Sequence, residues 1–357
     1  MRSRTVWLVM LVCMGMGTVW AQSTPSPALL VLLKRDRALA IVDPATLKVV
    51  GRVPAGPDPH EVVASPDGRT AYMSNYGGGA YNTITVADLA GQKSLPTIDL
   101  GVLHGPHGLW FAGGELYFTA EANKVFGRYD PTTQKIDWIL GTGQNRTHMI
   151  FVSNSLDRII TSNVSSGTIS IIEKMTRQMG PPGPPPGAAN GPPPSSNQMN
   201  GPPPGNRRAD WEQTIIPVGR GAEGFDITPD GKELWTGNAQ DGTISIIDLA
   251  SKKVIQTLDV NVRGANRLKF TLNGKRAFVS SLGGADLAVF DVGSRQEVKR
   301  IKLGRGAAGI LMQPDGARVY VSCSPDNYVA VIDLKTLEVV GRIEAGQEPD
   351  GLAWAVR

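Results

Sequence analysis

Short runs of alternating apolar and polar residues recur along the chain and are separated by turn residues. One copy reads TISIIDLASKKVIQTL, in which an alternating run ends at an aspartate, a short turn follows, and a second run begins. Asp-Gly or Asn-Gly turns stand between such copies: SPDG at 65–68, TPDG at 228–231, TLNG at 271–274 and QPDG at 313–316. Alternation with a period of two, closed by these turns, predicts short β-strands joined by hairpins.

The acidic residues that end the alternating runs are regularly spaced. They are Asp43, Asp88, Asp130, Glu173, Asp248, Asp291 and Asp333. The steps between them are 45, 42, 43, 75, 43 and 42 residues. A repeat of this length that holds four short strands is typical of one propeller blade. The long step contains a Pro/Gly-rich stretch at 174–210, which we expect to be a disordered insertion within blade three.

The two ends of the chain supply complementary parts of one repeat. The N-terminal stretch LLVLLKRDRALAIVDPATLKVVGRV contains three strands, and the C-terminal stretch PDGLAWAV contains a lone first strand. Pairing them completes a blade and removes exposed sheet edges. The sequence therefore predicts an all-β fold over residues 22–357: a single seven-bladed β-propeller of four-stranded blades, its ring closed by the N-terminal strands pairing with the C-terminal strand.

Residues 1–21 have the layout of a secretory signal peptide. Arg2 and Arg4 precede an apolar run, and a small-residue cleavage pattern ends at Ala21. We therefore expect export to the periplasm or the extracellular space, with no transmembrane segment in the mature chain. Cys323 is then the only cysteine. It lies in a strand pattern, which favours an apolar filler over a nucleophile.

Several stretches resemble known propeller repeats. The motifs PHEVVASPDGRTAYMSNYG, ARVYVSCSPDNYVAVIDLKTLEVV and TISIIDLASKKVI resemble the YVTN β-propeller repeat family. The blade-two stretch GPHGLWFAGGELYFTAEANKVFGRYD is similar to repeats of streptogramin-lyase-type propellers. The combination of PH and PDG is more loosely similar to propeller lactonases of the phosphogluconolactonase type. These resemblances imply the fold and suggest candidate activities, because blade repeats mainly encode packing.

Three of the four histidines stand at the same position of the repeat. Counting back from the SPDG-like turns gives seven equivalent residues, expected at the start of each innermost strand near one mouth of the central channel: His60, His107, His148, Glu223, Asn266, Ala308 and Asp350. Three neighbouring imidazoles can hold one divalent metal ion of unknown identity, with an open position for water or substrate. A metal-free ligand pocket and a plain solvated channel are the alternatives.

Other polar residues are expected near the same mouth. Three residues before the register stand Arg220, Arg263 and Arg305 in consecutive blades opposite the histidines, and His104 in blade two. Arginine forks suit carboxylate or phosphate recognition, although ordinary solvated loop arginines would show the same pattern. Tyr76, which follows a second strand, is placed to line the pocket.

The leading hypothesis is an exported binding protein with a His/Arg-lined site at the channel mouth. An alternative is a metal-assisted lactonase or lyase that uses His60, His107 and His148 as ligands, with Glu121 or Glu223 as general base. A second alternative is a protein-interaction scaffold that uses its rim. The expected partner is a small anionic molecule or a protein, and the expected state is a monomer. A net charge of only +4 argues against nucleic acid.

Overall fold

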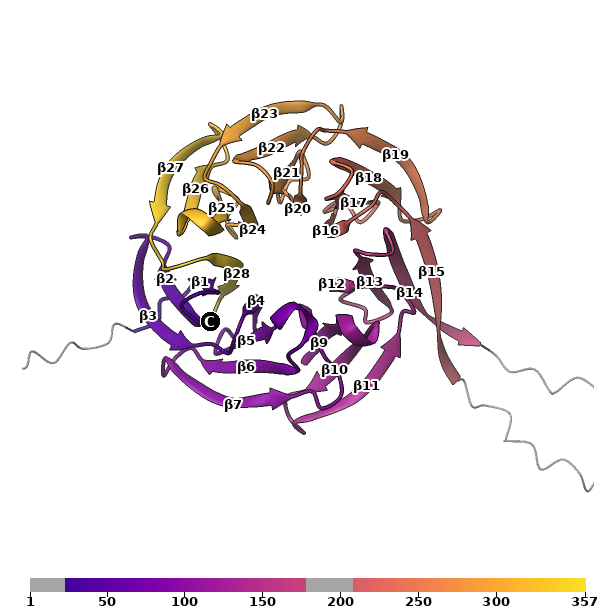
Figure 1. The fold of residues 1–357 in the computed structure, drawn as a ribbon, viewed down its shortest axis with the longest axis horizontal. Helices are drawn as coiled ribbons and strands as arrows, with labels where there is room; N and C mark the ends of the chain where they lie inside the picture. Colours follow the sequence, from indigo (N-terminus) through magenta and orange to yellow (C-terminus); the bar gives the residue numbers. More distant parts are fainter. Residues whose placement is uncertain (1–22, 178–207) are drawn as a thin grey trace, which may run out of the picture.

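Seven four-stranded antiparallel sheets stand around a common axis in the computed structural model, which describes residues 23–177 and 208–357 (Figure 1). Each sheet is one blade, so the predicted all-β, seven-bladed propeller is confirmed. The predicted signal peptide at 1–21 and residues 178–207 of the predicted insertion lie outside the described residues.

The blades follow one another in chain order, each from its innermost to its outermost strand. Blade one contains β4 (Pro59–Ala64), β5 (Thr70–Asn75), β6 (Thr83–Asp88) and β7 (Lys93–Asp99). Blade two contains β8 (Pro106–Ala112), β9 (Glu115–Ala120), β10 (Val125–Asp130) and β11 (Lys135–Gly141). Blade three contains β12 (Thr147–Val152), β13 (Arg158–Asn163), β14 (Thr168–Arg177) and β15 (Arg208–Pro217). Blade four contains β16 (Ala222–Ile227), β17 (Glu233–Asn238), β18 (Thr243–Asp248) and β19 (Lys253–Asp259). Blade five contains β20 (Ala265–Phe270), β21 (Arg276–Ser281), β22 (Asp286–Asp291) and β23 (Glu297–Lys302). Blade six contains β24 (Ala307–Met312), β25 (Arg318–Cys323), β26 (Tyr328–Asp333) and β27 (Glu338–Ile343). Short 3₁₀ turns follow three second strands: η1 (Gly77–Gly79), η2 (Glu121–Asn123) and η3 (Ser324–Asp326).

Blade seven joins the two ends of the described chain, as the sequence predicts. Its order is β28 (Pro349–Ala355), β1 (Ala28–Leu33), β2 (Ala38–Asp43) and β3 (Lys48–Pro54). Leu29 of β1 pairs with Trp354 of β28, and Leu30 pairs with Ala353. The C-terminal strand is therefore the innermost strand of this blade, and its pairing with β1 closes the ring.

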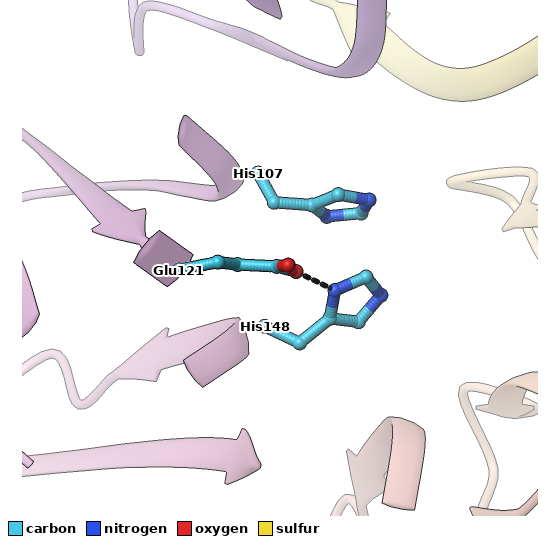
Figure 2. Close-up of side chains that lie close together, drawn as sticks. All are labelled: His107, Glu121 and His148. Atoms are coloured by element: carbon cyan, nitrogen blue, oxygen red, sulfur yellow. Dashed lines mark hydrogen bonds and ion pairs between the residues drawn. The ribbon is translucent and has the colours of Figure 1, made fainter. Parts of the chain in front are cut away.

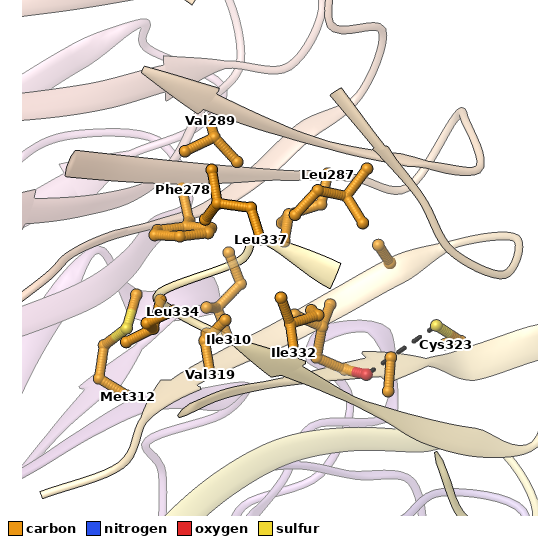
Figure 3. Close-up of a cluster of buried hydrophobic side chains, with 14 of the residues drawn as sticks. Phe278, Leu287, Val289, Ile310, Met312, Val319, Cys323, Ile332, Leu334 and Leu337 are labelled. Carbon is orange, nitrogen blue, oxygen red and sulfur yellow. Dashed lines mark hydrogen bonds between the residues drawn. The ribbon is translucent and has the colours of Figure 1, made fainter. Parts of the chain in front are cut away.

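The apolar core lies between neighbouring blades. In the cluster of Figure 3, Phe278 and Val289 of blade five share one buried cluster with Ile310 and Ile332 of blade six. Each sheet is covered on both faces, so second and third strands such as β18 are buried along most of their length. Cys323 is fully buried in the same cluster and burial raises its pKa, in agreement with its interpretation as an apolar filler.

The hairpin of β14 and β15 extends further than the sequence suggested. Its ladder continues to the pair formed by Arg177 and Arg208. Residues 174–177 and 208–210, which were predicted to belong to the insertion, are therefore strand residues. Residues 178–207 join the third and fourth strands of blade three. No helix in the described part of the chain has the length and apolar character needed to cross a membrane.

Candidate ligand site at the axis of the ring

The register residues lie at the second position of each innermost strand, one position later than expected: His60, His107, His148, Glu223, Asn266, Ala308 and Asp350. At this position the pairing with the second strand is interrupted. In β12, Thr147 pairs with Asn163 and Ile150 with Thr161, so the two residues between Thr147 and Ile150 are skipped. A bulge of this kind turns the strand and re-aims its side chains. The same irregularity occurs in all seven innermost strands.

Hydroxyl groups of the second strands fix the register residues to the preceding blade. The Thr119 hydroxyl accepts the N–H of Gly108 at 2.9 Å and donates to the carbonyl of His148 in blade three at 2.8 Å. Ser280 and Ser322 donate to the register carbonyls of the following blades at 2.9 and 2.8 Å. A Cβ at Gly108 would lie 2.4 Å from the His148 carbonyl oxygen, so this close approach requires glycine. The bonds position the imidazoles through their backbone.

His148 lies between two carboxylates. Its Nδ1 contacts Oε1 of Glu121, and its Nε2 lies 2.8 Å from Oε2 of Glu223. Glu121 comes from η2 of blade two and Glu223 from β16 of blade four, so three blades meet at one imidazole. Figure 2 shows the His148 ring beneath that of His107, joined by a dashed line to Glu121. Because both ring nitrogens face a carboxylate, the imidazolium form satisfies every partner.

The carboxylates determine the charge of His148. Burial alone lowers the pKa of His148, but the negative charge of Glu223 and the hydrogen bonds to Glu121 and Glu223 raise it to about 9. Burial raises the pKa of Glu223, but the charge and hydrogen bond of His148 and the charge of Arg146 bring that pKa down to about 2. The pKa of Glu121 is also lowered: burial opposes the change, and the hydrogen bond from His148 drives it. At neutral pH the three groups form one buried ion network.

His107 has the opposite character. Its ring centroid lies 3.7 Å from that of His148, and its side chain is buried. Its Nδ1 is also buried and has no hydrogen-bond partner among the described residues. Burial, followed by the positive charge of His148, lowers the pKa of His107 well below its ordinary value. A neutral imidazole with an unsatisfied nitrogen therefore stacks on a protonated one, and buried polar atoms of this kind are uncommon.

His60 belongs to a second, more open part of the site. Its ring centroid lies 5.1 Å from that of His107. Its Nε2 is 3.2 Å from Asp58 and its Nδ1 is 3.5 Å from the register residue Asp350, which also binds Lys34 at 3.3 Å. The hydrogen bond from His60 lowers the pKa of Asp58. His60 is therefore held by acidic neighbours of its own.

Two further residues complete the network around Glu121. The Tyr76 hydroxyl donates to Oε2 of Glu121 at 2.6 Å, and its ring lies edge-on to His107. Burial, followed by the bond to Glu121, raises the Tyr76 pKa to about 12, so the phenol stays protonated. Arg146 lies 3.3 Å from Glu121 and 3.7 Å from Glu223, and 38% of its side chain is exposed. Sequence reasoning missed Arg146; its only signal was a charge directly before β12.

An ion pair bridges the centre of the ring. Arg267 of β20 contacts Glu61 of β4, although blades one and five are not neighbours. The two side chains are only 10% and 15% exposed. Arg267 also donates to the side-chain oxygen of Asn266 at 3.1 Å, so the side chain of this register residue binds within the same cluster. Sequence reasoning missed this pair too. The available signal was a charged residue at the third strand position, where four other blades have glycine: Gly108, Gly224, Gly309 and Gly351.

The predicted arginine arc does not join this cluster. Arg220 and Arg305 lie on the rim, with side chains 77% and 75% exposed, and bind Asp241 at 2.7 Å and Asp326 at 2.8 Å. Those aspartates also accept the backbone N–H of the same arginines, so each loop is tied back onto its own blade. Arg263 is exposed as well. The expected mouth with imidazoles facing guanidiniums is therefore not formed.

His104 is also separate from the three register histidines. Its Nδ1 lies 2.9 Å from the carbonyl of Ala80, and its N–H donates to Asn123. This is the same loop position as that of the rim arginines, and its polar groups are used to fasten the loop. The structure therefore brings together three of the four predicted histidines.

The residues best placed to share a metal ion differ from the predicted set. One ligand atom each of His107, Glu121 and His148 lies within 4.8 Å of the others, whereas His60 is outside this group. Two donors of a tetrahedral zinc ion, each about 2.0–2.1 Å from the metal, lie about 3.4 Å apart. Small side-chain rotations would therefore admit an ion, provided that it displaces the proton that His148 shares with Glu121.

Comparisons with known proteins agree on the fold and leave the chemistry open. No family model matches the chain. The uncharacterised protein YncE of Salmonella typhimurium is 23% identical over 272 residues, 69% of this chain and 75% of that protein. A functionally unknown protein from Desulfotomaculum acetoxidans has a TM-score of 0.71 at 13% identity, covering 93% of this chain and 99% of that one. A candidate 6-phosphogluconolactonase from Bacteroides uniformis has a TM-score of 0.70 at 14% identity, covering 92% and 99%.

Proposed function

We propose that this is an exported binding protein that takes a small anionic ligand at the histidine end of the ring axis. The observation that carries the proposal is the concentration of buried ionisable side chains there: His107, His148, Glu121 and Glu223, with Arg146 at the open side. Blades five and six pack through an apolar cluster without any such network, so blade packing by itself does not require one. Buried polar networks cost free energy unless every member is satisfied, so their presence at one end indicates a site.

The ligand class follows from the groups that remain open. Arg146 is the cation with the most exposed side chain in the network, and a guanidinium has five N–H donors. The Tyr76 ring lies beside it, since Tyr76 and Arg146 both contact Glu121. A compact carboxylate or phosphate ester with a short apolar body suits this combination.

The test is isothermal titration in chloride-free buffer with a panel of small carboxylates and phosphate esters. Replacing Arg146 in R146Q lowers the affinity for the best ligand about tenfold or more, because a charge-assisted hydrogen bond is lost. The matched control R220Q removes a rim arginine of similar pairing and leaves affinity unchanged. If H107Q and H104Q have equal effects, or if both arginine variants bind like the parent, the site is not at the axis. Partner binding that survives all axial changes would instead favour the rim-scaffold hypothesis.

A second candidate is a metal-assisted lactonase or lyase. It is favoured by the 4.8 Å grouping of His107, Glu121 and His148 together with the unsatisfied His107 Nδ1. With the ion held by these residues, Glu223 remains as general base, 2.8 Å from His148. Metal analysis of the purified protein tests this function, combined with melting curves and lactone hydrolysis in Mg²⁺, Ca²⁺, Mn²⁺ or Zn²⁺. No stoichiometric metal and no response to any ion would exclude it.

A further inference from the structure

A groove between the outer strands of blades one and two has the character of a proline-binding surface. Its volume is about 720 Å³, and its walls come from β5 to β7 on one side and β10 to β11 on the other. Two tyrosines, Tyr72 and Tyr129, lie among apolar side chains that include Leu95, Pro96 and Ile136. The groove lies on the outside of the ring, away from the histidine cluster.

The two phenols are free to donate hydrogen bonds. Among the described residues neither the Tyr72 nor the Tyr129 hydroxyl has a hydrogen-bond partner, whereas Tyr320, the equivalent of Tyr72 in blade six, donates to Gln313 at 3.0 Å. Burial raises the pKa of Tyr72 to about 12 and that of Tyr129 above its ordinary value, so both stay protonated. Tyr72 is only 6% exposed and its ring packs against Phe111, so the partly buried Tyr129 supplies the aromatic surface. An extended proline-rich segment packs its rings on such a surface, and its carbonyls, which lack internal hydrogen bonds, can accept from the phenols.

The chain itself carries such a segment. Residues 178–207 contain 11 of the 26 prolines, in the runs GPPGPPPG, GPPP and GPPPG, and their only charged side chain is that of Arg207. The groove is lined by both polar and apolar side chains, and a nearly uncharged segment would meet no charge repulsion there. We propose that this proline-rich segment of the same chain binds the groove formed by Tyr72 and Tyr129.

The segment starts from the correct face and is long enough. It leaves the ring at the turn between the third and fourth strands of blade three, and Pro131 and Gln134 of the groove belong to the corresponding turn of blade two. Thirty residues that go out and return can reach about 45 Å in a polyproline conformation at ~3.1 Å per residue. The groove lies across one neighbouring blade, and packed sheets are about 10 Å apart.

The experiment places a fluorophore on the segment at S195C, in the full chain that also carries C13S, and measures its anisotropy. Cys323 is buried and competes little for the label. Binding in the groove gives high anisotropy that excess free GPPGPPPGAANGPPPSS peptide lowers. In the double variant Y72F/Y129F we expect about a tenfold weaker attachment, because two hydroxyl hydrogen bonds are lost while both rings remain. The control is Y81F, which removes the hydroxyl of an exposed tyrosine outside the groove.

Three results would overturn the proposal. The first is low anisotropy in the parent chain, and the second is the same anisotropy in the parent and in Y72F/Y129F at unchanged melting temperature. The third is anisotropy that rises with protein concentration together with a dimer in light scattering, which would assign the segment to the groove of a second copy. A parent monomer with high anisotropy that only the groove variant loses supports the proposal.

Discussion

The ion network at His148 predicts a loss of stability on the alkaline side. The folded pKa of His148 is about 9 and its ordinary value is 6.5, so folding favours the protonated form. A group with a raised folded pKa contributes its stability fully below its unfolded pKa and loses it as the pH rises through the folded pKa. The free energy of unfolding should therefore fall between about pH 6.5 and pH 9. The perturbation that tests the cause is H148Q.

The size of the effect follows from the two pKa values. The difference between about 9 and 6.5, at about 1.4 kcal/mol per pH unit, corresponds to about 3 kcal/mol. The lowered pKa of Glu223 describes the same ion pair from the other side, so the two contributions are not added. The lowered pKa of Glu223 also predicts that the free energy of unfolding falls on the acidic side, as the pH drops from the ordinary Glu pKa of 4.5 to about 2. A domain stability of about 5–15 kcal/mol makes a change of this size easy to measure.

The assay is urea unfolding at intervals from pH 6 to pH 9.5, with chelator present. The parent protein should lose about 3 kcal/mol across this range, H148Q should lack that loss, and the matched variant H104Q should retain it. H148Q leaves the carboxylates of Glu121 and Glu223 buried without the imidazolium between them, so a second variant is needed. E223Q removes one of the two carboxylates that raise the pKa of His148, and the alkaline loss of stability should therefore move to lower pH. Parent stability that stays flat to pH 9.5, or an identical decline in H148Q, would show that the His148 ion pairs do not cause the alkaline loss.

Three further predictions concern the packing that holds the site. Gly108→Ala should lower the free energy of unfolding by about 1–3 kcal/mol, since the added Cβ would lie 2.4 Å from the backbone of the next blade. The control Gly141→Ala, where the added Cβ has no neighbour within 4 Å, should be neutral in urea unfolding. Thr119→Val should lower the free energy of unfolding by about 1–3 kcal/mol because it leaves a buried N–H and a carbonyl unpaired, and an unchanged unfolding midpoint would contradict the bridging role. Arg267→Met should cost about 3–5 kcal/mol by leaving Glu61 buried without its partner, and a double-mutant cycle with Glu61→Gln should recover most of this loss if the pair across the ring is real.

The architecture was predictable because its signals are local. The step of about 43 residues between turn aspartates reports how many residues four strands and their turns need, and this number is nearly the same in every blade. The stretch at 28–33 reads as a buried strand by itself, and its lack of a preceding first strand predicts closure with 349–355, which the pairing of Leu29 with Trp354 confirms. The insertion boundary was misplaced, because the residues at 174–177 and 208–210 have no sequence feature that separates extended hairpin from loop.

The candidate site was predictable in its position along the chain and unpredictable in its contacts. Equivalent repeat positions place His60, His107 and His148 on consecutive blades, as the strand register shows. The same counting placed the rim residue Arg220 and overlooked Arg146, which approaches Glu121 to 3.3 Å. Arg146 stands two residues before the register and Arg220 three residues before it, both in the loop that leads into an innermost strand. One residue of difference in this loop decides whether the side chain approaches the axis or lies on the rim, and strand alternation does not predict the path of a loop.

The sequence by itself determined the number of blades, the closure of the ring and the register on which the histidines stand, because repeat length and strand alternation depend on near neighbours in the chain. Which groups meet became known from the assembled ring alone. Glu61 and Arg267 are 206 residues apart and touch across the ring, and His148 acquires its charge from carboxylates on two other blades. Contact and protonation depend on distances between blades and on exclusion of water, and these quantities exist only when the ring is assembled.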